Sequence, residues 1–122
     1  MLLPYLTMAT PVSEVESMLH VQFVSSFTPS WRYAQDSAVP VLTSQSDNHV
    51  LQLAWGLRLK KKKATPSLWV QAEGIIKQRA TRVSIRIRRC LAIANCFFIK
   101  SFPSDILIYN PREKFMLLAG IW

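Results

Sequence analysis

The clearest pattern of hydrophobic and polar positions lies between residues 51 and 60. Apolar side chains occupy every odd position of this stretch: Leu51, Leu53, Trp55, Leu57 and Leu59. The even positions carry polar, charged or small residues: Gln52, Ala54, Gly56, Arg58 and Lys60. A period of two is typical of a strand with one buried face. We therefore predict a strand here that ends at the lysine run 60–63, with Pro66 beyond it.

The C-terminal third contains three short apolar runs, at residues 96–99, 106–109 and 115–118. Pro103 follows the first run, and Asn110 with Pro111 separates the last two, which is a strong turn signal. Runs this short and apolar must be buried together, because exposed they would promote aggregation. We predict short strands that pack against one another.

Residues 67–96 fit two different periods. At 100° per residue, eight apolar side chains fall within an arc of about 80°: Trp69, Ala72, Ile76, Ala80, Val83, Ile87, Cys90 and Ala94. Four arginines then form a separate cationic stripe: Arg79, Arg82, Arg86 and Arg89. Gly74 opposes a helix, and the β-branched residues among the arginines fit a strand equally well. We predict a helix over residues 67–80 and leave residues 81–89 open between helix and strand.

The N-terminal third is interrupted by four prolines and shows no sustained period beyond a short alternation at residues 19–23. We expect residues 1–48 to be loosely ordered and residues 49–122 to form a small basic domain. The expected fold is a small single domain, α+β or β-rich, of short strands with one amphipathic helix and a loosely ordered N-terminal third.

Positive charge is concentrated in one part of the chain. The formal net charge is +8, and residues 58–89 hold eleven of the fifteen Lys and Arg residues but a single acid, Glu73. Such asymmetry is typical of proteins that bind nucleic acid or an anionic membrane surface. The candidate binding residues are Arg58, Lys60, Lys61, Lys62, Lys63, Arg79, Arg82, Arg86, Arg88 and Arg89.

Two further features bear on a nucleic-acid partner. Trp55 and Trp69 flank the lysines. Proteins bind single-stranded nucleic acid through exposed aromatic rings beside basic side chains, because the bases stack on the rings. Trp55, however, shares its predicted strand face with four leucines and is better explained as a core residue. The four lysines 60–63 are also typical of a nuclear import signal, so we expect a nuclear or cytoplasmic location.

The residues that catalysis or metal binding would need are scarce. Candidate metal ligands are limited to Cys90, Cys96, His20 and His49, which do not have metal-site spacing. Ser44, Ser46, Asp47 and His49 contain the residue types of a catalytic triad, but triad members converge from distant parts of a fold rather than from one polar turn. We expect a non-enzymatic protein without a cofactor, a metal or a small-molecule substrate.

The sequence thus favours weak, sequence-independent binding of RNA or another polyanion. One alternative is peripheral association with anionic membranes through a cationic amphipathic helix over residues 67–94. Another is a lineage-specific product without a selected biochemical activity. In an evolved sequence the local pattern and the global fold normally agree, whereas here they agree in one predicted strand and conflict across residues 67–96.

Overall fold

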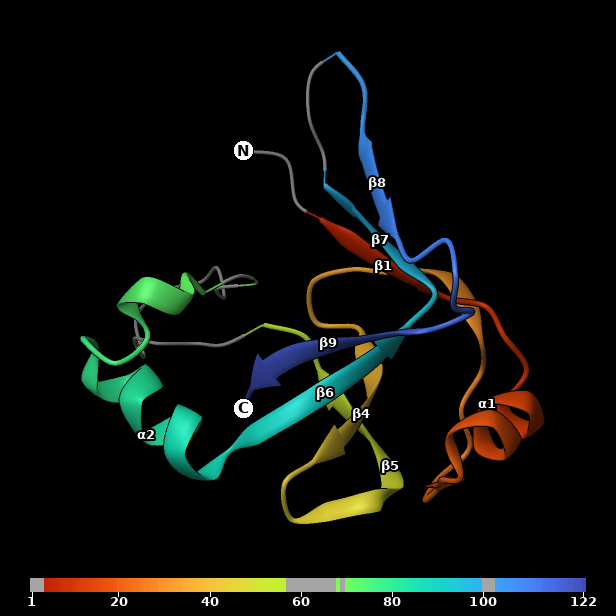
Figure 1. Cartoon of the computed structure of the whole chain (residues 1–122), viewed down its shortest axis with the longest axis horizontal. Helices are drawn as coiled ribbons and strands as arrows, with labels where there is room; N and C mark the ends of the chain where they lie inside the picture. Colours follow the sequence, from red (N-terminus) through yellow and green to blue (C-terminus); the bar gives the residue numbers. More distant parts are fainter. Residues whose placement is uncertain (1–3, 57–67, 69, 100–102) are drawn as a thin grey trace.

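The computed structural model describes residues 4–56, 68, 70–99 and 103–122, and these residues form a mixed α+β domain (Figure 1). The strands of this part of the chain are β1 (Tyr5–Met8), β2 (Gln22–Phe23), β3 (Ser30–Tyr33), β4 (Ala38–Thr43), β5 (Ser46–Ala54), β6 (Arg89–Ala94), β7 (Cys96–Ile99), β8 (Ile106–Tyr109) and β9 (Met116–Ile121). Its helices are α1 (Val12–Leu19), the 3₁₀ turn η1 (Ala72–Gly74) and α2 (Arg79–Ile87). The expected small α+β domain of short strands is confirmed.

The described strands form two sheets. One has the order β3-β1-β7-β8, and its strands pair antiparallel. The other has the order β2-β5-β4-β6-β9, in which only the short β2 pairs parallel to its neighbour. In Figure 1, α1 and α2 lie at opposite sides of the second sheet. The longest ladder joins β6 to β9, from Arg89 opposite Ile121 to Ala94 opposite Met116.

The hydrophobic core draws on both ends of the chain. Its buried residues are Leu6, Met8, Val15, Val21, Tyr33, Val39, Val41, Val50, Ile93, Ala94 and Phe115. Seven of these eleven precede residue 48, and from Tyr5 onward this third of the chain carries β1, α1, β2, β3 and β4. Because these elements are short and joined by proline-containing turns, they leave no sustained period in the sequence. The expected boundary at residue 48 falls inside β5.

Most of the predicted strands are present. β7 and β8 coincide with the apolar runs 96–99 and 106–109, and β9 begins in the third run. The alternating stretch also forms a strand, β5, in which Leu51 and Leu53 pack against the core. The prediction is wrong at its end, because β5 stops at Ala54 and the described residues Trp55 and Gly56 are not in a strand; Leu57 and Leu59 lie outside the described residues.

The helix prediction for residues 67–80 is wrong in position. In the described part of this stretch, η1 is a single 3₁₀ turn and an α-helix begins only at Arg79. Gly74 has the lowest helix propensity after proline, which explains the interruption. Residues 79–87 are helical, so the strand alternative there is also wrong. The helix over residues 67–94 that the membrane alternative assumed ends at Ile87, and Cys90 and Ala94 belong to β6.

Asn95 makes the hydrogen bonds at the point where the chain leaves one sheet and enters the other. Its backbone N–H donates to the Thr7 carbonyl of β1 (2.8 Å), and its Oδ1 accepts from the Ala9 N–H (2.8 Å). Its Nδ2 donates to Thr10 Oγ1 (2.9 Å) and to the Lys114 carbonyl (3.1 Å). The Asn95 side chain therefore holds the residues that follow β1 and the segment that precedes β9.

We expect the Asn95→Ala substitution to lower the free energy of unfolding by about 2–3 kcal/mol, because three side-chain hydrogen bonds of roughly 1 kcal/mol each are lost. Urea denaturation measures the change. Asn110→Ala is the matched control, since its Oδ1 accepts a single exposed bond from the Arg112 N–H (3.0 Å), and it should cost less than about 1 kcal/mol. Equal losses from the two substitutions would contradict the central role of Asn95.

Candidate functional site

The orientation of α2 is set by two buried hydroxyl residues on its inner face. Thr81 and Ser84 are buried, and Thr81 Oγ1 lies 2.6 Å from the Ile75 carbonyl and 3.2 Å from the Gln78 carbonyl, so its hydroxyl can donate to either. This bond ties the first turn of α2 to the segment before it. The opposite face of the helix is therefore directed to solvent.

The solvent face of α2 and the strand that follows carry five exposed arginines. We call this group the arginine surface: Arg79, Arg82, Arg86, Arg88 and Arg89. Residues 79–89 contain no acid, and within the part of the chain that the structure describes none of the five forms an ion pair. Arg86 lies in the last turn of the helix, where the helix dipole favours a cation.

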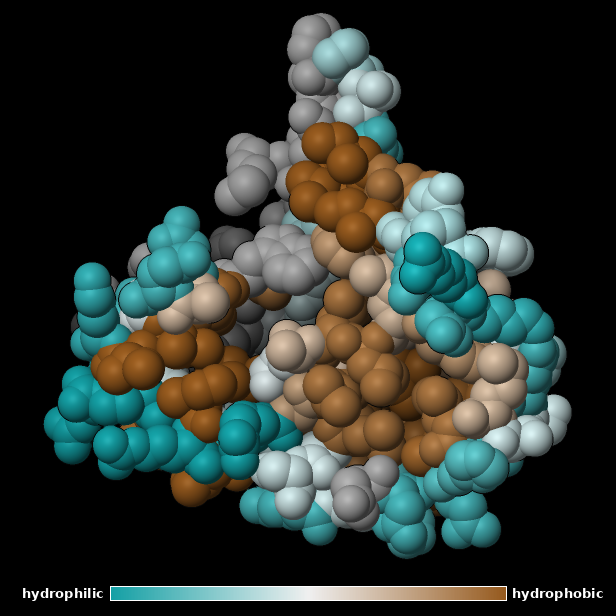
Figure 2. All heavy atoms as spheres, in the orientation of Figure 1, coloured by the Kyte–Doolittle hydropathy of each residue, from teal (hydrophilic) through white to brown (hydrophobic). Residues whose placement is uncertain are grey.

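Aliphatic side chains are exposed beside these arginines. Ile76 is 67% exposed, Val83 47% and Ile87 55%, and Figure 2 shows apolar side chains adjoining hydrophilic ones over this part of the molecule. Val83 and Ile87, which the helical period places on one apolar arc, are thus exposed. The inner face carries the small buried residues Thr81 and Ser84, together with Ile85.

The structure brings together only part of the candidate set. Arg79, Arg82 and Arg86 lie on one side of α2, and Arg88 and Arg89 follow the helix. The other candidates, Arg58, Lys60, Lys61, Lys62 and Lys63, lie outside the described residues. Trp55 packs against the core, and its Nε1 donates to the Leu68 carbonyl (3.2 Å). This ring is thus a core residue, as its leucine neighbours indicated, and is not displayed for base stacking.

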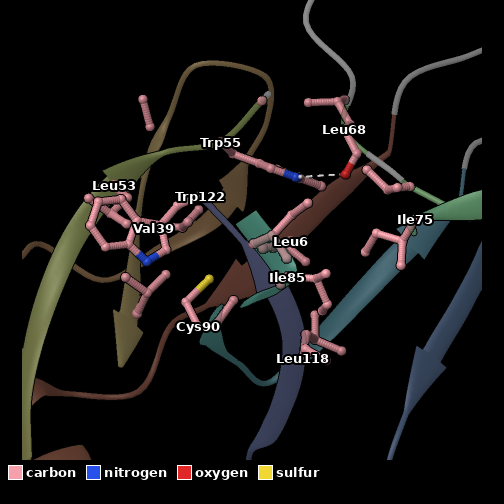
Figure 3. A pocket seen from close by; sticks show the side chains of 18 of the residues that line it. Leu6, Val39, Leu53, Trp55, Leu68, Ile75, Ile85, Cys90, Leu118 and Trp122 are labelled. Carbon is pink, nitrogen blue, oxygen red and sulfur yellow. Dashed lines mark hydrogen bonds between the residues drawn. The ribbon is translucent and has the colours of Figure 1, made fainter. Parts of the chain in front are cut away.

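A cavity of about 580 Å³ lies behind α2, between this helix, η1 and the second sheet (Figure 3). Leu6 of β1, Ile85 of α2, Cys90 of β6 and Leu118 of β9 converge on it from four elements. Among the described residues no charged side chain lines it. Its volume and apolar lining are those of a small-molecule site.

Among the described lining residues, the one ionisable side chain is the thiol of Cys90. Burial raises the pKa of this thiol above its usual value, so at neutral pH it is protonated and weakly nucleophilic. Gly120 of β9 makes room for it, because a Cβ at that position would lie 3.0 Å from the Cys90 sulfur. The thiol therefore acts as a small apolar group in the wall of the cavity.

The described residues hold no group of three or more His, Cys, Asp or Glu side chains that could bind a metal ion. Ser44 lies in the turn between β4 and β5, whereas Ser46, Asp47 and His49 belong to β5, where His49 pairs with Gln22 of β2. None of the helices in the described ranges has the length and apolar character needed to cross a membrane.

Comparison with known proteins shows only that the fold of this chain resembles a solved structure. No protein-family model matches the chain, and no curated protein matches it either. The chain is similar to an X-ray crystal structure of a protein from Bacteroides thetaiotaomicron, with a TM-score of 0.74 and 20% sequence identity. The match covers 96% of this chain and 58% of that one, so this chain spans less than two thirds of the length of its structural neighbour.

The raised pKa of Cys90 predicts a shifted pH profile for its alkylation. In the Cys96→Ser variant, where Cys90 is the one remaining thiol, the rate should reach half its maximum above pH 8.5, the usual thiol value. Only the thiolate reacts, so a raised pKa moves the curve to higher pH. Unfolding in urea should return the midpoint to its usual value. A folded midpoint at or below pH 8.5 would contradict the burial of this thiol.

Proposed function

We propose that the protein binds single-stranded RNA weakly and with little sequence preference, through the arginine surface. The observation that supports this most is the row of exposed arginines without acidic partners on the outer face of α2. Guanidinium groups pair with phosphate oxygens in a bidentate geometry, which contributes affinity without reading the bases. The proposal assigns no catalytic step to the protein.

The spacing of the arginines suits a flexible strand. Arg79, Arg82 and Arg86 recur every three or four residues, so they lie on one side of the helix along its length. Arg88 and Arg89 extend the positive charge beyond the C-terminal end of the helix. A single strand can follow such a row with consecutive phosphates. The lysine run 60–63 would strengthen RNA binding through its positive charge alone.

The exposed aliphatic residues favour a second candidate, association with an anionic membrane surface. Val83 and Ile87 are one helical turn apart, and the arginines flank them. An apolar strip bordered by cations is the arrangement by which interfacial helices bind lipid. A nine-residue helix offers little apolar area, however, so RNA remains the first candidate.

Replacing Arg79, Arg82 and Arg86 together with Gln tests the RNA proposal, because Gln has a similar helix propensity and leaves α2 intact. Each phosphate contact on a single strand contributes about 0.7 to the slope of log affinity against log salt concentration. Loss of three contacts should lower that slope by about 2 and weaken binding to unrelated oligoribonucleotides at low salt. Fluorescence anisotropy at several salt concentrations measures both quantities.

The matched control replaces Arg32, Arg112 and Lys114 with Gln, which removes the same net charge away from α2. It should leave most of the affinity in place. Equal losses in the two triple variants would mean that binding reflects net charge alone and would overturn the assignment to the arginine surface. A double variant, Val83→Ser with Ile87→Ser, distinguishes membrane association from RNA binding. It should weaken binding to anionic vesicles and leave binding to RNA unchanged.

We also propose that the lysine run 60–63 directs the protein to the nucleus. A fluorescent fusion too large to diffuse through nuclear pores should accumulate in nuclei, and replacement of the four lysines with alanine should abolish this. The Arg79, Arg82 and Arg86 triple variant is the control for loss of positive charge. If the lysine variant localises as the parent does, the run is not an import signal.

A further inference from the structure

The cavity behind α2 has a chemistry different from that of the arginine surface. Its described lining is apolar, with the Cys90 thiol in its neutral form as the one ionisable group. A charged or strongly polar group placed deep in it would lose its hydration without a compensating partner. The body of any ligand must therefore be apolar, and about 580 Å³ accommodates a medium-length hydrocarbon chain.

A positive charge lies beside the cavity, next to one of its lining residues. Trp122 lines the cavity, and the Arg88 guanidinium lies over its ring, 5.8 Å from the ring centroid. The backbones of the two residues are joined as well, because the Trp122 N–H donates to the Arg88 carbonyl (2.9 Å). Arg88 is exposed, and no acid in the described part of the chain pairs with it. Its guanidinium is thus held against the Trp122 ring, outside the described lining itself, and is available to an anion.

The same wall contains an unused hydrogen-bond donor. The indole N–H of Trp122 is buried and has no acceptor among the described residues. Leaving such a donor unpaired costs about 1–3 kcal/mol. Because the nitrogen is covered, it is not offered to a ligand in the cavity, and the ligand head is assigned to Arg88 alone.

We propose that the cavity binds a small amphipathic anion, a carboxylate with an unbranched aliphatic chain, with the chain inside and the carboxylate at Arg88. Two separate features support this occupant: the apolar lining and the guanidinium held against the Trp122 ring. The inference does not depend on the proposed RNA binding, although Arg88 belongs to the arginine surface as well as to this site, because the apolar lining has no part in binding RNA.

Titration with decanoate and with 1-decanol, followed by calorimetry, tests the proposal. Decanoate should bind one molecule per chain, more tightly than decanol. Arg88→Gln should weaken decanoate binding about tenfold, the factor expected for one charge-assisted hydrogen bond, and leave decanol binding unchanged. Arg82→Gln is the matched control, because it removes an equal charge from α2 away from the cavity wall, and it should leave decanoate binding unchanged.

Binding is assigned to the cavity by two further measurements. Val70→Phe, at a half-exposed lining position, should block decanoate and decanol alike, whereas Val24→Phe at an exposed position outside the lining should block neither. Saturating decanoate should also slow alkylation of Cys90 in the Cys96→Ser variant. Circular dichroism checks that each variant is folded.

Three outcomes would overturn the proposal: no saturable binding, equal affinity for decanoate and decanol, or binding that Val70→Phe leaves intact. These outcomes are distinguishable from failure of the RNA proposal. Val70→Phe should not alter the binding of RNA, and the Arg79, Arg82 and Arg86 triple variant should not alter the binding of decanoate.

Discussion

The hydrogen bonds of Asn95 hold the two sheets in register with each other. This residue is the single step between β6 of one sheet and β7 of the other, and its bonds reach Thr7, Ala9, Thr10 and the carbonyl of Lys114. With β1 fixed by these bonds, α1 packs Val15 into the core, and the segment that leads to β9 is aligned for the β6–β9 ladder. The wall of the cavity that β6 and β9 form depends on this arrangement.

The position of α2 follows from small polar residues rather than from an apolar face. Thr81 and Ser84 are buried against the rest of the domain, and the Thr81 hydroxyl bonds to backbone carbonyls, so the helix needs no large apolar inner surface. Because its inner face is small, its arginines and two aliphatic residues, Val83 and Ile87, are directed outward. A helix that satisfies its own buried hydroxyls can thus display a strongly cationic face without destabilising the core.

Two chemically distinct surfaces therefore meet at the C-terminal end of α2. The arginine surface faces solvent and suits phosphate groups, whereas the cavity behind the helix suits an apolar chain. Arg88 belongs to the first of these surfaces and adjoins the second, because its guanidinium lies over the ring of Trp122, which lines the cavity.

The sequence alone determined the local elements whose pattern is carried by adjacent residues. The alternation around Leu51 and Leu53 predicted β5, the short apolar runs bounded by prolines predicted β7 and β8, and the clustered charge predicted the arginines that the structure groups together. Tertiary structure decided what depends on contacts between distant residues. Whether residues 79–87 form a helix was decided by the buried bonds of Thr81, because intrinsic propensity and periodicity favoured helix and strand almost equally. The cavity could not be predicted from the sequence either. Leu6, Cys90 and Trp122 line it together only because the sheets bring β1, β6 and the end of β9 close to one another.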